Sequence, residues 1–352
     1  MSHRLPHLPG TLSPSDVVET AEAIVALQLP NGMIPWFRGG HCDPWNHVET
    51  AMGLDVAGFH YAAERAYEWL AAMQRPDGSW HNYYVADGVS DAKLDTNVCA
   101  YVATGVWHHW LCTHDRGFVD AMWPVVARAL EWVLELQTPR GEIIWARHVH
   151  GKPWSYALLT GSSSICHALR CGIAIGQLVG DERPEWELAA VNLAEAIREQ
   201  PDAFAPKHRW AMDWYYPVLT GVVTGEAAHR RLSERWGEFV LDGLGVRCVR
   251  TEPWVTAAET AECAMAHAIA GDSDTARALL ACTRRHRHDD GSYFTGVVYP
   301  DRITFPDRER TAYSGAAVIL AADLLTGASP ASGVFLGHGL PAVADEWFED
   351  PI

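Results

Sequence analysis

The sequence is short of positive charge and lacks the long apolar segments of membrane and secreted proteins. Lys and Arg number 27 against 44 Asp and Glu, giving a net charge of -17, which argues against nucleic acid or an anionic membrane as a partner. No apolar run approaches the roughly 18 residues of a membrane span, and the polar, Pro-rich N-terminus has no signal segment. We therefore expect a cytoplasmic protein that acts on a small molecule.

The chain also lacks the short motifs of several common enzyme classes. Its 8 cysteines show no CxxC spacing, which favours buried thiols in a reducing compartment over a disulfide scaffold. No Gly-rich loop opens a helix after a strand, and no GxSxG is present. Nucleotide binding and a Ser-His-Asp hydrolase are therefore unsupported, and we expect no cofactor.

What the chain does contain is a repeated segment in which Gln is followed four residues later by Gly and then by an aromatic residue. The copies comprise Gln28, Gly32 and Trp36; Gln74, Gly78 and Trp80; Gln137, Gly141 and Trp145; and a degenerate copy with Gly291 and Tyr293. Each copy reads as the end of a helix, a turn and an aromatic anchor. A repeat of about 50 residues built from two helices predicts a closed helical toroid.

Hydrophobic periodicity and breakers place two helices in each repeat. Outer helices are expected over residues 14–29, 61–74, 118–137, 184–199, 225–241 and 273–287. Inner helices, rich in small residues that allow close packing, are expected over residues 46–60, 94–112, 160–179, 212–223, 255–271 and 311–326. The predicted fold is all-α: an (α/α)6 barrel over residues 14–326, preceded by an arm (1–13) and followed by a tail (327–352) packed on the barrel.

The loops that lead from outer to inner helices are long, whereas the return loops are short. The long loops are expected over residues 30–45, 75–93, 138–159, 200–211, 242–254 and 288–310. Long loops in a compact domain are usually functional, so the site should lie on the rim where the inner helices begin. The free N–H groups of those helix ends favour anionic or hydroxyl-rich ligands.

Carboxylates recur on this rim and are the candidates for acid–base chemistry, which needs two carboxyl groups with separated pKa values facing one cavity. We expect the catalytic residues among Asp43, Glu49, Asp95 and Asp213, with His47 as an auxiliary. The competing interpretation is helix capping, which suits Asp95 well and Glu49 poorly, because Glu49 lies about one turn inside its helix.

Aromatic and basic residues gather on the same rim. Aromatic rings stack on sugars or stabilise carbocations, and Arg holds anionic groups, although such rings also plug barrel mouths and rim charges also pair with each other. The expected substrate-binding residues are Trp36, Arg38, Trp45, Trp80, Tyr84, Trp154, Trp214, Tyr215, Arg250, Trp254, Glu259 and Tyr313. A metal at His41, Asp43 and His47 is left open, but their spacing matches no zinc motif and we expect none.

The repeat resembles the QW motif of the terpenoid cyclase and prenyltransferase superfamily, most clearly over residues 65–80 and 128–145. The resemblance implies the toroidal fold more than the reaction. The DxDD acid of the cyclases and the zinc-binding Asp-x-Cys of the prenyltransferases are both missing. The predicted barrel is also similar to that of carbohydrate-active enzymes, whose sites are rich in aromatic residues and carboxylates.

Our leading hypothesis is a carbohydrate-active enzyme, a glycoside hydrolase, lyase or epimerase that uses rim carboxylates on a sugar or glycoconjugate. One alternative is a terpenoid cyclase-like or prenyl-handling enzyme with an isoprenoid substrate and a non-standard acid. Another is a non-catalytic binding toroid. A cavity with several acids and amides favours a sugar, and an apolar cavity with one acid favours a terpenoid. The oligomeric state is not predicted.

Overall fold

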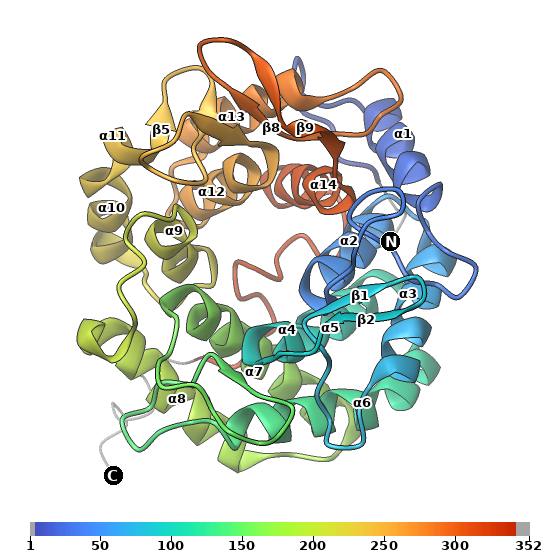
Figure 1. Cartoon of the computed structure of the whole chain (residues 1–352), viewed down its shortest axis with the longest axis vertical. Coiled ribbons are helices and arrows are strands. Elements are labelled where there is room, and N and C mark those ends of the chain that lie inside the picture. The colour runs from blue at the N-terminus through green and yellow to red at the C-terminus, as the bar shows by residue number, and fades with distance from the viewer. Residues whose placement is uncertain (1–3, 343–352) are drawn as a thin grey trace.

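The computed structural model describes residues 4–342, in which helices form two concentric rings (Figure 1). The inner ring contains α2 (Pro44–Val56), α4 (Thr96–Ala100), α5 (Val102–Thr113), α7 (Leu159–Val179), α9 (Met212–Leu219), α12 (Ala257–Ile269) and α14 (Ala312–Thr326). The outer ring contains α1 (Pro14–Val25), α3 (His60–Met73), α6 (Arg116–Leu134), α8 (Pro184–Glu199), α10 (Gly225–Glu234) and α13 (Ser273–Cys282). The predicted helical barrel class is confirmed.

Consecutive inner helices pack against each other, and α14 packs against α2, so the inner helices surround a central space. Small residues make this wall tight. A Cβ atom on Gly53 would lie 2.9 Å from the Ala316 Cα atom, and one on Gly105 would lie 2.3 Å from a Val48 methyl group. Both distances are shorter than a carbon–carbon contact, so any larger residue would push neighbouring helices apart.

The repeated Gln–Gly segment joins each outer helix to the next. In three copies the Gln side-chain amide donates to the carbonyl of its own turn glycine and to a carbonyl of the following outer helix. These bonds run from Gln28 to Gly32 and Ala62, from Gln74 to Gly78 and Val125, and from Gln137 to Gly141 and Ala189. The motif thus works as a structural clamp, repeated around the barrel.

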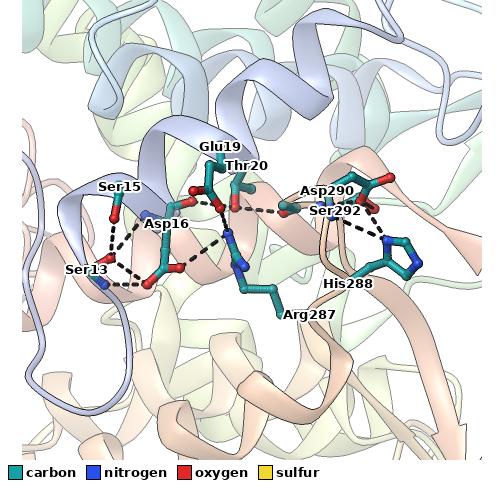
Figure 2. Close-up of polar contacts among 10 residues, drawn as sticks. Ser13, Ser15, Asp16, Glu19, Thr20, Arg287, His288, Asp290 and Ser292 are labelled. Carbon is teal, nitrogen blue, oxygen red and sulfur yellow. Dashed lines mark hydrogen bonds and ion pairs between the residues drawn. The ribbon is translucent and has the colours of Figure 1, made fainter.

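The degenerate last copy closes the ring onto the first helix, as Figure 2 shows. The Thr20 hydroxyl of α1 donates to the Gly291 carbonyl over 2.8 Å, and Arg287 forms ion pairs with Asp16 and Glu19. Gly291 has φ +83°, and a Cβ atom there would lie 2.5 Å from the Glu19 carbonyl group. Only glycine satisfies both the left-handed turn and this close approach.

A reciprocal side-chain cap fixes the start of α1. Ser13 is the N-cap, Pro14 is the first helical residue, and the Ser13 side chain accepts from the Asp16 N–H group while Asp16 accepts from the Ser13 N–H group. This reciprocal capping satisfies two of the N–H groups that a helix start leaves free, which is why the helix begins at this position.

The long rim loops carry strands, which the all-α expectation missed. They form three two-stranded ribbons and one three-stranded sheet ordered β7-β8-β9, with all pairs antiparallel. The strands are β1 (Tyr83–Val85), β2 (Gly88–Asp91), β3 (Leu94–Asp95), β4 (Ala146–Arg147), β5 (Val240–Leu241), β6 (Gly245–Val246), β7 (Trp254–Thr256), β8 (Phe294–Val298) and β9 (Ile303–Arg310). Alternation over so few residues gives too weak a pattern to identify from sequence.

Several helix bounds also differ from the expected ranges. The expected inner helix 94–112 is interrupted at Tyr101 between α4 and α5. The expected outer helices 225–241 and 273–287 end early and continue as α11 (Trp236–Phe239) and the 3-10 turn η2 (Thr283–His286); another 3-10 turn, η1 (Pro201–Ala203), follows α8. None of the described helices, within residues 4–342, is long and apolar enough to cross a membrane.

Residues 327–342 lie across the end of the barrel opposite the long loops. The Phe335 ring stacks on His167 of α7 with centroids 5.1 Å apart, and Arg170 Nε donates to the Pro341 carbonyl over 2.8 Å. Val334 and Phe335 are buried. The rest of the expected tail, residues 343–352, and residues 1–3 of the expected arm lie outside the described residues.

Candidate active site

A cavity of about 150 Å³ opens among the N-terminal parts of the inner helices, on the side of the long loops. Its wall contains five residues expected from the sequence: Trp36, Trp45, Glu49, Glu259 and Tyr313. It also contains four that were not expected: Asn46, Met212, Ala258 and Glu262. Because α2 and α12 each contribute carboxylates, acids from distant parts of the sequence face one space.

Asp43 lies at the mouth of this wall as the N-cap of α2. Its Oδ1 accepts from the Asn46 backbone N–H over 2.9 Å, and its Oδ2 accepts from Trp36 Nε1 over 2.7 Å and Asn46 Nδ2 over 2.8 Å. Burial raises the pKa of Asp43, although these three donors oppose the shift. Trp36 and Asn46 line the cavity, so Asp43 is held directly behind the lining.

Glu49 lies on the same helix, about one and a half turns deeper. No hydrogen bond to its carboxyl group comes from any residue within 4–342. Burial, followed by the negative charges of Asp43 and Glu259, raises the pKa of Glu49 to about 8. Glu49 is therefore protonated at neutral pH, a neutral donor in a buried cavity.

Glu262 faces Glu49 from α12. Burial raises its pKa well above the usual range, as do the charges of Glu49 and Glu259, while a hydrogen bond donated by the Tyr215 hydroxyl opposes the shift. Glu259, one turn nearer the helix start, is only partly buried. By helix position the carboxyl groups stand at two levels: Asp43 and Glu259 are nearest the helix starts, and Glu49 and Glu262, at the floor, are about one turn or more deeper. Of the four, only Asp43 lies behind the lining.

His47, expected as an auxiliary catalytic group, points into the helix packing instead. Its Nδ1 accepts from the Ile34 backbone N–H over 3.2 Å, and its Nε2 donates to the Ala66 carbonyl over 2.9 Å. Burial lowers the pKa of His47 to about 4, so it stays neutral. With both ring nitrogens bonded to backbone groups, it has none left for a substrate.

Asp95 and Asp213 do not line the cavity. Asp95 caps α4 through the Asn97 and Val98 N–H groups, and burial raises its pKa to about 6 against the opposing charge of Lys93. Asp213 accepts from the Thr160 hydroxyl over 3.0 Å, and burial raises its pKa. Capping, the competing interpretation of Asp95, accounts for its position.

Four of the expected substrate-binding aromatic residues are packed away from the cavity. Trp80 is fully buried and donates to the Leu70 carbonyl, and Trp214 is fully buried and stacks on Phe239. Tyr84 is buried against Trp69, and Trp254 stacks on Phe305 of the three-stranded sheet. Tyr215 is buried too, but its hydroxyl reaches Glu262.

The expected basic residues also lie elsewhere. Arg250 pairs with Glu238 on the outer wall. Arg38 lines a separate open depression of about 530 Å³ beside α1, together with Arg308 and Arg310. Trp154 lies in the loop that follows β4, in a group of aromatic rings. None of these residues is part of the cavity wall.

A larger groove of about 750 Å³ lies on the outer flank, between α10 and the start of α13. It contains His229, Trp236 and His267 but no residue from the N-terminal ends of the inner helices. The carboxylate-lined cavity is therefore the better candidate for chemistry, although it is smaller. Within residues 4–342, no three His, Cys, Asp or Glu side chains converge to hold a metal, and all eight cysteines are free.

Glu262 was missed although the sequence contains a signal for it. Glu259 and Glu262 are three residues apart on an expected inner helix, a spacing that places both on one face. Asn46 and Met212 are sequence neighbours of the expected residues Trp45 and Asp213, but no sequence pattern indicates that they face the cavity. The three carboxyl groups and the amide of the lining match the polarity expected for a sugar site, and this polarity does not match an isoprenoid site.

Comparisons with known proteins agree with this chemistry. No protein-family model matches the chain. The MMP endo-(1,4)-3-O-methyl-alpha-D-mannosidase of Mycolicibacterium hassiacum is 50% identical over 337 residues, which are 96% of this chain and 93% of that protein.

Two solved structures have a similar fold. A wild-type glycosidase matches with a TM-score of 0.68 at 16% identity, covering 90% of this chain and 98% of that one. The GH63 mannosylglycerate hydrolase of Thermus thermophilus, in complex with glucose, matches with a TM-score of 0.64 at 14% identity, covering 87% and 99%. The resemblance to terpenoid cyclases, by contrast, receives no support from these comparisons.

Proposed function

This chain belongs to the glycoside hydrolase family of the Mycolicibacterium hassiacum mannosidase, and from that premise we propose that it cleaves α-(1→4) bonds between 3-O-methylated mannose units within a chain. The enzyme is a glycoside hydrolase, so the lyase, epimerase and isoprenoid alternatives are set aside. The substrate proposal is supported by the 50% identity and by the carboxyl groups that line the cavity.

The proposed mechanism rests on one observation: helices α2 and α12 each carry two carboxyl groups at the cavity, one near the start of the helix and one deeper. A cavity of about 150 Å³ is on the scale of one sugar ring, not of a chain. If one ring fills it, the bond to the next ring lies at the mouth. The carboxyl groups nearest this end are Glu259, in the first turn of α12, and Asp43, at the start of α2 directly behind the lining.

In this mechanism Asp43 is the general acid. Burial raises its pKa, which is the direction that a general acid giving a proton to the leaving oxygen requires. The hydrogen bonds from Trp36 and Asn46 hold it in one orientation. Glu259, partly exposed at the mouth, is the general base that removes a proton from the water attacking the anomeric carbon.

Glu49 and Glu262 have a different role at the floor. Both carry raised pKa values, and Glu49, with a pKa of about 8, is protonated at neutral pH and can donate a hydrogen bond to the ring inside the cavity. A methyl ether oxygen accepts hydrogen bonds but cannot donate them, and a protonated carboxyl group is a matching partner. Met212 and Ala258 supply apolar surface in the same wall for a methyl group.

Amide substitutions separate these roles, because an amide mimics a protonated carboxyl group as a donor but cannot transfer a proton. We expect Asp43→Asn and Glu259→Gln to lose on the order of 10²–10⁴-fold in kcat on a 3-O-methylated α-(1→4)-mannan oligosaccharide. Glu49→Gln and Glu262→Gln should lose about tenfold or less and should act mainly on KM. Kinetics on all four variants, with circular dichroism as a fold control, make the measurement.

A substrate with an activated leaving group distinguishes the acid from the base. With a dinitrophenyl 3-O-methyl-α-D-mannoside the leaving group needs no proton, so Asp43→Asn should recover activity while Glu259→Gln should not. If Glu49→Gln instead shows the 10²–10⁴-fold loss and Asp43→Asn does not, the pair at the mouth is wrong. If the wild-type protein cleaves neither substrate, the substrate proposal is wrong.

The finer description of the fold is also a proposal. We describe residues 14–326 as an (α/α)6 barrel of six helix pairs, which is supported by the inner-helix contacts and by the repeated Gln–Gly clamps. The arm (1–13) and tail (327–352) complete this domain division. A cytoplasmic location remains a proposal as well, in keeping with the eight free cysteines.

A further inference from the structure

An enzyme that cleaves inside a chain has to bind more than the one ring that its cavity holds. This inference rests on the proposed function, because it concerns the units of the same substrate that lie outside the cavity. A group of four aromatic rings lies on the same rim: Trp145, His148, Trp154 and Tyr156, which we call the aromatic platform.

The rings of the aromatic platform lie in one hairpin-like loop that follows α6. Trp145 and Tyr156 are stacked with centroids 5.4 Å apart, and His148 and Trp154 are stacked with centroids 5.1 Å apart. Trp145 meets Trp154 edge to face at 4.8 Å, so the two stacks form one group. His148 is exposed and the other three rings are half-buried, unlike the buried rings of the barrel wall.

The backbone holds this group firmly. The Trp145 N–H donates to the Tyr156 carbonyl over 2.9 Å, which closes the loop across its two arms. The Thr96 N–H and hydroxyl both donate to the Trp145 carbonyl, at 3.0 and 2.9 Å, and join the loop to the start of α4. A fixed platform loses little conformational entropy when a ligand binds to it.

Asp95 has a clear place in this arrangement. Its carboxylate lies 3.9 Å from Lys93 Nζ, which is itself 4.2 Å from the Trp145 ring centre. Lys207 lies 5.8 Å from the Tyr156 ring centre. Asp95 is therefore a positioning residue for the platform, and the two lysines add hydrogen-bond donors at its edge.

The platform connects to the cavity through Tyr83 of β1. The Tyr83 ring meets Trp36, which lines the cavity, edge to face at 5.9 Å. Burial raises the pKa of Tyr83 to about 12, and the charges of Asp43 and Asp95 add to the shift. The neighbouring Asn82 N–H donates to the Lys93 carbonyl over 2.8 Å, and Lys93 Nζ lies 4.2 Å from the Trp145 ring centre, so the segment that contacts Trp36 also joins the platform.

Half-buried rings with polar groups at their edges are the surface that a sugar chain fits. The apolar face of a pyranose packs on an aromatic ring while its hydroxyl groups reach lysine and carboxylate side chains. A nucleic acid is disfavoured by the net charge of -17. We propose that the aromatic platform binds sugar units of the substrate chain that lie beyond the ring held in the cavity.

The test is the dependence of catalysis on chain length. Wild-type protein, Trp154→Ala and Tyr61→Ala are assayed on a dinitrophenyl 3-O-methyl-α-D-mannoside and on 3-O-methylated α-(1→4)-mannan oligosaccharides of increasing length. Tyr61 is a matched control, since it is 73% exposed and lies on the outer helix α3. We expect Trp154→Ala to lose about tenfold in kcat/KM on the long chains and to match the wild type on the aryl substrate.

Each result decides one question. Equal effects of Trp154→Ala on the short and long substrates, or no effect on either, overturn the platform while leaving the cavity chemistry intact. A wild-type protein inactive on both substrates overturns the proposed function instead. If Trp154→Ala is misfolded by circular dichroism, Lys207→Ala replaces it, and its expected loss is likewise confined to long chains.

Discussion

Two buried carboxyl groups of helix α2 behave in opposite ways, one facing the cavity and one near the C-terminal end of the helix. Glu49, toward the cavity, has no hydrogen bond from any described residue, and burial with the Asp43 and Glu259 charges raises its pKa to about 8. Asp55, six residues later, is fully buried. It is within 3.0 Å of the Nδ1 atoms of His60 and His109, and these hydrogen bonds outweigh burial and lower its pKa.

The difference separates a group kept for chemistry from a group kept for structure. Burial alone destabilises the charged form of both carboxyl groups. At Asp55 the protein supplies donors that restore the charge, and no space is left for a ligand. At Glu49 it supplies neighbouring negative charges and a cavity, and leaves the hydrogen-bonding capacity of the carboxyl group for something that enters from outside.

The largest expected effect comes from making the same carboxyl-to-amide change at each end. Asp55→Asn removes a fully buried, charge-bearing partner of two imidazole groups, and should lower the free energy of unfolding by about 3–5 kcal/mol. Glu49→Gln replaces a neutral donor with another neutral donor and removes the cost of keeping Glu49 protonated at pH 7, so it should raise the free energy of unfolding by on the order of 3 kcal/mol. Urea denaturation of both variants measures the contrast.

Equal stability losses in the two variants would contradict this comparison. A large loss of stability in Glu49→Gln alone would mean that the Glu49 carboxyl group bonds to another part of the protein. Glu49 would then not be available to a ligand in the cavity. Enzyme activity serves as a second readout, because Asp55→Asn lies at the far end of the barrel. The folded fraction of that variant should keep wild-type KM.

The pH dependence of stability should differ in sign between the two groups. The folded pKa of Glu49 is about 8, above its unfolded value of ~4.3, so its contribution is complete below pH ~4.3 and is lost as the pH rises toward 8. The folded pKa of Asp55 is lowered, so its contribution is present above the unfolded pKa of ~3.9 and is lost as the pH falls through the folded value.

Denaturation at a series of pH values tests these signs. Glu49→Gln should show a smaller decline in unfolding free energy between pH ~5 and 8 than the wild type, and Asp55→Asn a smaller decline below pH ~4. Glu262→Gln, whose parent group also has a raised pKa, should behave like Glu49→Gln. An alkaline decline unchanged in both cavity variants would contradict the raised pKa values.

The fold was largely predictable because its signals are local. A Gln and a turn glycine four residues apart act over a few residues and recur in three copies along the chain. The short strands of the rim were missed, because most have only two to five residues, which carry almost no period, and the eight residues of β9 are mainly polar and include Pro306. The degenerate last copy could be recognised because it keeps its turn glycine, Gly291. The glycine is kept because α1 passes too close to this position for a side chain.

The candidate site was predictable only in part, because it depends on where side chains point. Trp36 and Trp80 follow the same repeat, yet one lines the cavity and the other is buried in the wall. Helix position identified Asp43, Glu49 and Glu259 as rim carboxylates, but nothing in the sequence could state that α2 and α12 face each other across one space. That pairing arises from ring closure, a long-range property.

The smallest expected effect concerns the hydrogen bond that the Tyr215 hydroxyl donates to Glu262. Tyr215→Phe removes the donor to Glu262 and should lower the free energy of unfolding by about 1 kcal/mol at pH 7, since the carboxyl group stays neutral and keeps its own proton. Because that bond opposes the raised pKa of Glu262, its loss should raise the pKa further, and the alkaline limb of stability should extend to higher pH.

His109→Phe, which removes a donor to the ionised Asp55, is the matched change at the other end and should cost several times more. If Tyr215→Phe and His109→Phe lower the free energy of unfolding equally, then Glu262 is ionised like Asp55. The two carboxyl groups would then differ only in that Glu262 lines a cavity and Asp55 does not.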